Sequence, residues 1–170
     1  MRSPADMRLY CFTAGNLLKG RDPVELVAAQ IAGGADAIQL REKHMSKRKK
    51  LELGFELRGL TRSEGVLFIV NDDLDLAVIL GADGVHLGQD DIPIQYARGL
   101  SGGMLIGVST HNKAQAVAAV SSGADYIGIG PVFDTGTKED HEPVIGLDVL
   151  SEIVAACPVP SVAIGGIGLD

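Results

Sequence analysis

Gly34-Ala35-Asp36-Ala37-Ile38-Gln39-Leu40 occurs three times in the chain in closely similar form. The second copy begins at Gly81 and the third at Gly123. Each copy follows a helical pattern and opens a short apolar strand, and its glycine suits the left-handed backbone at a helix end. Because the intervals exceed one strand and one helix of a compact barrel, we expect each to hold two βα units.

The segments between the copies supply the other elements. Asp22-Pro23-Val24-Glu25 is typical of a helix start, with a capping Asp, Pro at the first position and Glu three residues after the cap. Leu67–Val70 is a short apolar run, typical of a parallel strand covered on both faces. Strands are expected near residues 8–13, 37–41, 67–71, 84–88, 105–109, 126–131 and 161–165, with a helix between each pair.

Strict alternation of strands and helices predicts a parallel sheet. An open doubly wound sheet would carry a glycine-rich nucleotide loop after its first strand, where this chain has Thr13-Ala14-Gly15-Asn16. The sequence therefore favours an α/β fold of the (β/α)8 TIM barrel type. We expect residues 1–170 to form a single barrel domain that lacks its C-terminal βα portion, since only seven strands are found.

Composition excludes several classes of protein. Hydrophobic residues make up 46% of the chain, ample for a core, and the formal charge of −7 argues against a nucleic acid or anionic membrane partner. No apolar run approaches the ~18 residues of a membrane span. Cys11 and Cys157 fit no metal spacing, so we expect both to be reduced core residues of a cytoplasmic protein. The basic cluster Lys47–Lys50 is interpreted as a solvated helix face.

Polar residues and glycines follow each expected strand, at the end where barrel enzymes bind their substrates. Cations and carboxylates both occur there. Arg and Lys would bind a diphosphate, a carboxylate or two would hold Mg²⁺ together with phosphate oxygens, and glycines would admit a second phosphate. The residues are Gln39, Arg41, Glu42, Lys43, Asn71, Asp72, Asp73, Gln89, Asp90, Asp91, Ser109, Thr110, His111, Thr135, Thr137, Lys138, Gly165 and Gly166.

Six motifs, in order from about residue 8 to the end, resemble those of thiamine-phosphate synthases. They are Gln39-Leu40-Arg41-Glu42-Lys43; Asn71-Asp72; the stretch GADGVHLGQDD over residues 81–91; Gly107-Val108-Ser109-Thr110-His111; Gly130-Pro131-Val132-Phe133 followed by Thr135, Thr137 and Lys138; and Ala163-Ile164-Gly165-Gly166-Ile167. One such motif would be weak, whereas six in register are specific.

The resemblance implies a transferase of thiamine biosynthesis. It would couple 4-amino-2-methyl-5-hydroxymethylpyrimidine diphosphate to thiazole phosphate and release diphosphate. Diphosphate leaves first, and the thiazole nitrogen then attacks the pyrimidine methyl carbocation. The protein's share would be positioning and stabilisation of the leaving group.

The family's site residues carry over by position. Arg41, Lys43 and Lys138 would be catalytic, acting on the leaving diphosphate. Asp72 and Asp91 would hold Mg²⁺. The substrate-binding set would be Gln39, Leu40, Arg41, Glu42, Lys43, Asn71, Ser109 and Lys138 for the pyrimidine diphosphate, and Thr135, Gly136, Thr137 and Gly166 for the thiazole phosphate.

Other residues are interpreted as structural. Asp36, Asp83 and Asp125 of the repeat would lie at the stabilising end of the barrel. Asp73 and Asp90 are expected to be caps or solvated charges, and His86, which alternates with apolar neighbours, to be packed. The role of His111 is left open. For the pair Ser109 and His111, the sequence shows no orienting carboxylate of the kind that a nucleophilic triad needs.

Two other functions stay open at this stage. A thiazole tautomerase resembling this family would use a His near position 111 and need no metal. A non-catalytic family member would keep only ligand affinity. The partners expected are small-molecule substrates and a second copy of the chain in a homodimer, with neither nucleic acid nor membrane.

The family continues for another helix, strand and helix, whose last turn supplies backbone groups for the thiazole phosphate. The first and seventh strands, both apolar, are expected to be buried, with unpaired backbone groups costing ~1–3 kcal/mol each. We therefore expect the chain alone to be unstable or paired through that edge, and to have little synthase activity.

Overall fold

A computed structural model describes residues 3–13, 15, 18, 20–135 and 142–168. The chain separates into two compact units. The first extends to His86 and includes Ser101–Met104, and the second comprises Leu87–Leu100 and the chain from Leu105 onward.

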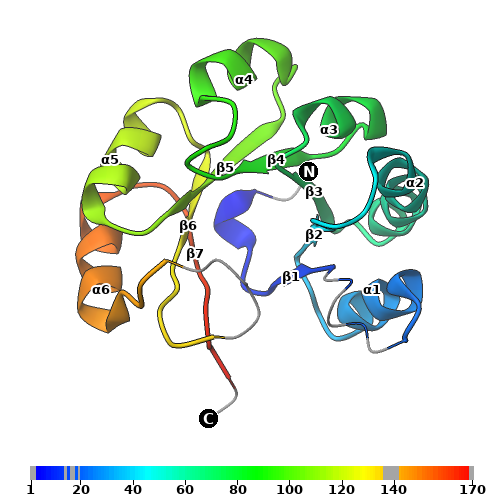
Figure 1. The fold of residues 1–170 in the computed structure, drawn as a ribbon, viewed down its shortest axis with the longest axis horizontal. Helices are drawn as coiled ribbons and strands as arrows, with labels where there is room; N and C mark the ends of the chain where they lie inside the picture. The colour runs from blue at the N-terminus through cyan, green and yellow to red at the C-terminus, as the bar shows by residue number, and fades with distance from the viewer. Residues whose placement is uncertain (1–2, 14, 16–17, 19, 136–141, 169–170) are drawn as a thin grey trace. The chain divides into compact units, whose positions relative to one another are not determined.

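The first unit contains strands β1 to β3, most of β4 and helices α1 to α3, which lie beside the strands (Figure 1). Neighbouring strands pair in parallel from β1 to β4. Every residue of β2 is buried, as are the first four of β3. The elements are a 3-10 turn η1 (Pro4–Asp6), β1 (Tyr10–Phe12), α1 (Pro23–Ala32), β2 (Ala37–Leu40), α2 (Lys47–Ser63), β3 (Leu67–Asn71), α3 (Leu74–Leu80) and β4 (Gly84–Leu87).

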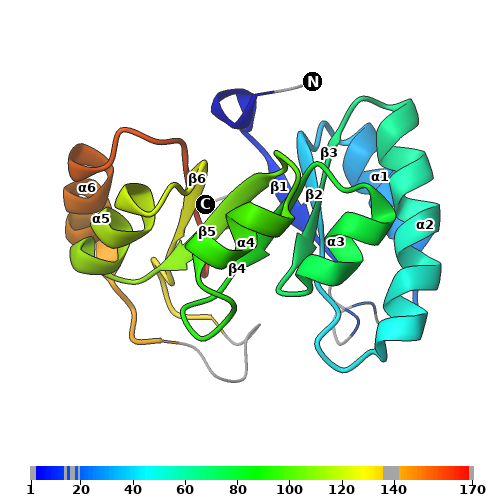
Figure 2. The ribbon, with the colours of Figure 1, turned by 90° about the horizontal axis from the view of Figure 1, so that it is seen from above.

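The second unit continues the alternation. Its strands pair in parallel from β5 to β7, and helices α5 and α6 lie side by side, as both views show (Figures 1 and 2). The Nζ of Lys113 donates to Oε1 of Glu152 at 3.1 Å between these two helices. The elements are α4 (Ile94–Leu100), β5 (Leu105–Thr110), α5 (Lys113–Ser121), β6 (Tyr126–Ile129), α6 (Gly146–Ala156) and β7 (Ser161–Ala163).

The strands occur in the sheet in the order in which they occur in the chain, from β1 to β7. A doubly wound sheet reverses its order near the first strand, so this alternative is excluded. The predicted succession of seven strands with a helix in each interval is confirmed among the described residues.

Side-chain caps begin three of the helices. Oδ1 of Asp22 accepts from the N–H groups of Val24 and Glu25 at 2.8 and 3.0 Å, with Pro23 at the first helical position. This confirms the start of α1 predicted from four consecutive residues. Ser46 and Asn112 cap α2 and α5 in the same manner.

The repeated Gly-Ala-Asp ends a helix identically in all three copies. The glycines have positive φ angles of 96°, 57° and 94° at Gly34, Gly81 and Gly123. In each copy the glycine N–H donates to the carbonyl three residues before it and the alanine N–H to the carbonyl five residues before it. This is the Schellman arrangement, which requires a left-handed residue and satisfies carbonyls at the helix end. The predicted role of the glycine is confirmed.

The aspartate of each copy then binds the strand that precedes the helix. Asp83 N–H donates to the Phe68 carbonyl at 2.9 Å, and its Oδ2 accepts from Phe68 N–H at 2.9 Å. Asp125 makes the same reciprocal pair with Ile106, at 2.8 and 2.7 Å. Asp36 does so with Leu9, at 2.9 and 3.2 Å. The three aspartates are therefore structural, as predicted, and each joins the starts of two neighbouring parallel strands.

Two of these aspartates also bind an arginine. Arg58 of α2 makes two hydrogen bonds to Asp83, at 2.8 and 3.1 Å, and both side chains are largely buried. Arg98 of α4 reaches Oδ2 of Asp125 at 2.6 Å. A carboxylate that accepts from a backbone N–H and from a guanidinium holds helix and strand together through one group.

The outer strands differ from expectation. Strand β1 is half-buried at each of its residues, while Ser161 and Ala163 of β7 are exposed and Val162 is half-buried. The predicted burial is therefore wrong for the seventh strand and only partly met by the first. For the seventh strand the reason is clear. The prediction assumed cover on both faces, whereas Ser161 and Ala163, which alternate onto one face, remain open to solvent.

Both cysteines are free, as expected. Cys157 is buried, whereas Cys11 in β1 is half-buried, and burial raises the pKa of its thiol above the usual value. Among the helices in the described part of the chain, none combines the length and the apolar character that crossing a membrane requires.

We predict that Asp83→Ala lowers the free energy of unfolding by about 3 kcal/mol, because Phe68 N–H and the Arg58 guanidinium both lose a buried acceptor. Chemical denaturation measures the loss. Glu152→Gln is the control, since its pair with Lys113 is about half-exposed (side-chain exposures of 51% and 56%) and should change stability by about 0–1 kcal/mol. Equal losses in the two variants would show that Asp83 has no special structural role.

Candidate functional site

The end of β2 carries two cations. Arg41 N–H donates to Oγ1 of the buried Thr13 at 2.9 Å, which fixes the backbone just beyond the strand. The Arg41 side chain is half-buried and Lys43 is exposed. Neither makes an ion pair with any of the described residues. Cations at a strand end that have no ion-pair partner in the described part of the chain are suited to bind an anionic group.

The other residues of the stretch from Gln39 to Lys43 are buried. Gln39 is 2% exposed and its Nε2 donates to the Tyr10 hydroxyl at 2.9 Å. Leu40 is also 2% exposed. Glu42 is 7% exposed, and its Oε2 accepts from Gly15 N–H at 3.0 Å. Gln39, Leu40 and Glu42 thus pack within the first unit, while Arg41 and Lys43 are more open to solvent.

The end of β3 has an unusual backbone. Asp72, which follows Asn71, has a φ angle of 60° and is the one described residue other than glycine with a positive φ. The turn is closed by hydrogen bonds from Asp73 N–H to the Asn71 carbonyl at 2.6 Å and from Leu74 N–H to the Asp72 carbonyl at 3.0 Å. A left-handed non-glycine residue costs of order 1–3 kcal/mol and persists only where its surroundings hold it.

Those surroundings include a network of ion pairs. Nζ of Lys50 lies 2.7 Å from Oδ2 of Asp73, and the two side chains are 17% and 14% exposed. Nζ of Lys47 lies 3.0 Å from Oδ1 of Asp73 and 2.8 Å from Oδ2 of Asp75. The cluster interpreted as a solvated face is therefore partly a clamp between α2 and the start of α3. That interpretation missed it because the aspartates lie more than twenty residues away in the sequence.

Hydrogen bonds shift the titration of the exposed members. Lys47 holds the pKa of Asp75 below its usual value, and its own pKa is raised by hydrogen bonds to Asp75 and then Asp73. Asp75 is therefore more acidic in the folded chain, and its stabilising contribution is present above its unfolded pKa and lost as the pH falls below it.

In the second unit, Asp91 belongs to a tight turn after β4. Its Oδ2 accepts from Gly88 N–H at 2.6 Å. A Cβ on Gly88 would lie 3.0 Å from the same oxygen, so glycine suits this turn. Asp91 is half-buried, while the neighbouring Asp90 is exposed, as the solvated interpretation of Asp90 expected.

At the end of β5, Ser109 and His111 make hydrogen bonds to different partners. The Ser109 carbonyl accepts from Nε2 of Gln89 at 2.6 Å. Nδ1 of the half-buried His111 lies 2.6 Å from the Gly130 carbonyl. A backbone carbonyl therefore faces Nδ1 of this ring in the described part of the chain. His86 is buried, as predicted.

The turn after β7 lies against the loop after β6. Phe133 N–H donates to the Gly165 carbonyl at 2.9 Å. Gly166 has a φ angle of 64°, and a Cβ there would lie 2.4 Å from the Asp134 carbonyl oxygen. The structure thus brings Gly166 beside the chain that leads to Thr135. Gly136, Thr137, Lys138 and His141 lie outside the described residues.

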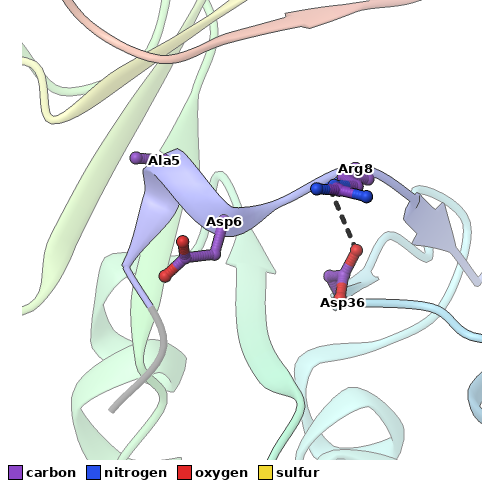
Figure 3. Close-up of a pocket in the computed structure, with 4 residues that line it drawn as sticks. All are labelled: Ala5, Asp6, Arg8 and Asp36. Carbon is purple, nitrogen blue, oxygen red and sulfur yellow. Dashed lines mark hydrogen bonds between the residues drawn. The ribbon is translucent and has the colours of Figure 1, made fainter.

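A shallow pocket lies at the opposite end of the strands in the first unit. Ala5, Asp6, Arg8 and Asp36 line it, and Asp36 accepts there from Arg8 N–H (Figure 3). These residues precede β1 and β2, whereas Arg41 and Lys43 follow β2. The pocket is therefore remote from the predicted site within its unit, and its aspartate serves the strand clamp.

Within the described residues, no three His, Cys, Asp or Glu side chains gather as a metal site would require. Magnesium does not need such a group, since one or two carboxylates suffice when phosphate oxygens supply the other ligands. Asp72 and Asp91 provide hard oxygen donors of the appropriate kind. Each carboxylate, Asp72 in the first unit and Asp91 in the second, is thus of the chemical kind that such an ion binds.

The chain was compared with known proteins. A family model described as thiamine monophosphate synthase matches residues 9–170. A thiamine-phosphate synthase from Chloroflexus aurantiacus is 51% identical over 162 residues, which are 95% of this chain and 75% of that protein. One from Pelotomaculum thermopropionicum is 49% identical over 160 residues, 94% of this chain and 73% of that protein.

A solved structure is also similar. The thiamine phosphate pyrophosphorylase from Pyrococcus furiosus has a TM-score of 0.88 and 41% sequence identity, with 97% of this chain and 78% of that chain covered. Together with the strand order, this likeness confirms the expected (β/α)-barrel class. The tautomerase alternative is not favoured, because the relatives named above carry the synthase name.

We predict that Lys50→Met lowers the free energy of unfolding by about 1–2 kcal/mol, because the largely buried Asp73 carboxylate loses a charged hydrogen-bond donor. Urea denaturation checks the value. Lys49→Met removes the neighbouring exposed lysine of the same helix and should leave stability within about 0.5 kcal/mol. If both variants unfold at the urea concentration of the parent, the clamp between α2 and α3 contributes nothing.

Proposed function

Because the chain belongs to the thiamine-phosphate synthase family, we propose that its own residues couple the aminopyrimidine diphosphate to thiazole phosphate and release diphosphate. Membership makes the protein a transferase of thiamine biosynthesis that acts on small-molecule substrates. The observation that carries the proposal is the match over residues 9–170, which includes every residue assigned a role below.

We assign the diphosphate end of the pyrimidine substrate to Arg41, Lys43 and Lys138, with Asn71 and Ser109 as further ligands. The support comes from Arg41 and Lys43 at the end of β2, whose side chains make no ion pair with any of the described residues. As the carbon–oxygen bond to the leaving group breaks, negative charge grows on the diphosphate. Fixed cations favour that state over the ground state, which is where rate acceleration arises.

Gln39, Leu40 and Glu42 belong to the same substrate-binding stretch. Their burial supports a role in shaping it: Gln39 is tied to Tyr10, Leu40 packs, and Glu42 is tied to Gly15. We propose that these three hold the backbone from which the two cations extend.

Asp72 and Asp91 would hold Mg²⁺, which supplies positive charge against the diphosphate. Asp91 is oriented by Gly88 N–H, and the backbone of Asp72 is fixed by the turn at the end of β3. Each carboxylate is thus presented by a constrained loop, as a metal ligand should be.

The thiazole phosphate is assigned to Thr135, Gly136, Thr137 and Gly166. The support is the left-handed Gly166 beside the Phe133–Asp134 backbone, where no side chain would fit. Glycines at such a turn allow backbone N–H groups to approach a phosphate. The phosphate anchors the thiazole so that its nitrogen faces the pyrimidine methyl carbon, and a carbon–nitrogen bond then replaces the carbon–oxygen bond.

The domain organisation, the cellular location and the partners of the protein are also proposals. We propose that residues 1–170 belong to one barrel domain, supported by the single strand order. A cytoplasmic location is supported by the two free cysteines. A homodimer is supported by exposed apolar side chains such as Val78 and Ile79 of α3, and the net charge of −7 opposes nucleic acid as a partner.

The function is tested by incubating the chain with both substrates and Mg²⁺ and measuring thiamine phosphate and diphosphate. Equal amounts of the two products, with none in the presence of a chelator, are expected. Metal-independent rearrangement of a thiazole phosphate without coupling would instead identify a tautomerase, in which His111 would carry the proton.

Asp91→Asn should weaken Mg²⁺-dependent binding of diphosphate at least about tenfold, because a charged ligand to the ion is lost. Calorimetric titration with diphosphate, with and without Mg²⁺, measures the change. The amide oxygen can still accept from Gly88 N–H, so folding should be retained. Asp90→Asn, at the exposed neighbour, is the control, and a parent-like affinity in Asp91→Asn would remove the metal assignment.

Lys138→Ala should lower turnover by ~10²–10³-fold and raise the Michaelis constant less, because its contact with the diphosphate strengthens toward the transition state. Steady-state kinetics with both substrates varied give the two parameters. Lys113→Ala removes an exposed lysine that pairs with Glu152 and should leave both unchanged. Unaltered turnover in Lys138→Ala would exclude the catalytic role.

A further inference from the structure

Glu42 is a buried acidic residue of the first unit with one carboxylate oxygen unsatisfied in the described part of the chain. The residue is 7% exposed, and its Oε1 is buried without a hydrogen-bond partner among the described residues. Its Oε2 accepts from Gly15 N–H at 3.0 Å. A buried carboxylate is costly unless it is well compensated, and replacing it with an apolar residue often stabilises a fold. Its presence therefore calls for an explanation other than stability.

The bond to Gly15 is part of a series. Just after β1, Thr13 N–H donates to the carbonyl of Gln39 in β2 at 2.9 Å. Just after β2, Arg41 N–H donates to Oγ1 of Thr13 at 2.9 Å. Gly15 N–H then donates to the Glu42 carboxylate. The first bond continues the strand ladder, whereas the other two use side chains. The two chain segments therefore stay joined after both strands have ended.

Gly15 is built to make this contact. A Cβ at that position would lie 2.5 Å from Oε2 of Glu42, which is closer than any side chain permits. Gly15 does not have a positive φ, so its glycine is explained by the approach of the carboxylate and not by a left-handed backbone. The fit between the glycine and the acid is specific.

The series holds the chain at Arg41 and directly before Lys43, the two cations proposed to bind the diphosphate. Arg41 is bound through its own N–H, and Glu42 lies between Arg41 and Lys43 in the sequence. A residue bonded on either side of a cation restricts where that cation can extend. We propose that Glu42 is a positioning residue, which ties the segment after β1 through Gly15 to the end of β2 and so orients Arg41 and Lys43 for the diphosphate.

This inference rests on the proposed function and deepens it, because it separates residues that bind diphosphate from one that acts through them. Glu42 acts through its hydrogen bond to Gly15 and not through contact with the substrate. A glutamine, whose carbonyl oxygen can accept the same bond, should therefore replace it, whereas an alanine should not. Gly15→Ala should act like Glu42→Ala, because the added Cβ displaces the carboxylate.

The test compares Glu42→Ala, Glu42→Gln and Gly15→Ala with the parent. Calorimetry with inorganic diphosphate and Mg²⁺ should show at least a tenfold loss of affinity in both alanine variants and less than a threefold loss in Glu42→Gln. The Michaelis constant for thiazole phosphate should stay within twofold, since its proposed ligands lie in the second unit. Glu56→Ala, at an exposed glutamate of α2, is the matched control and should bind like the parent.

A second measurement does not depend on activity. Amide hydrogen exchange at Gly15 should be slow in the parent and in Glu42→Gln, and fast in Glu42→Ala. Parent-like diphosphate affinity in Glu42→Ala, fast exchange of Gly15 in the parent, or an equal loss for thiazole phosphate would each overturn the positioning role. A parent that binds no diphosphate would overturn the proposed function as well, so the two failures can be distinguished.

Discussion

The structure depends above all on the reciprocal hydrogen bonds between an aspartate at the start of one strand and the backbone at the start of the strand before it. Asp36, Asp83 and Asp125 each close such a pair. Parallel strands have no hairpin to set their register, so something else must do so. In this chain a helix ends at a left-handed glycine, and the aspartate two residues later fixes the strand against its predecessor.

This arrangement separates stability from chemistry along the strands. The clamping aspartates precede β2, β4 and β6, whereas the proposed site residues lie at the other ends of strands or just beyond them. The left-handed backbone of Asp72 can therefore be tolerated, because the register of β3 is already fixed at its other end by Asp83. The left-handed Asp72 and the buried Glu42 are costs that such a scaffold can bear.

The charged residues divide in the same way. Lysines and arginines that hold the fold have carboxylate partners, as Lys50 does with Asp73 and Arg58 with Asp83. Arg41 and Lys43 have none among the described residues. A cation without a partner keeps its full attraction for a ligand, since no internal ion pair must first be broken. The lack of an internal partner therefore suits Arg41 and Lys43 to the diphosphate-binding role proposed for them.

The sequence by itself determined the features that depend on residues close together in the chain. The Asp22 cap, the glycine helix ends and the succession of strands and helices follow from hydrogen bonds spanning two to five residues, or from regular apolar spacing. The family, and with it the function, followed from six short motifs in order. Tertiary structure alone decided that Lys50 pairs with Asp73, that β7 is exposed, and that Glu42 is buried against Gly15. Those partners lie more than twenty residues apart or depend on which faces are covered, and neither property is encoded in a local pattern.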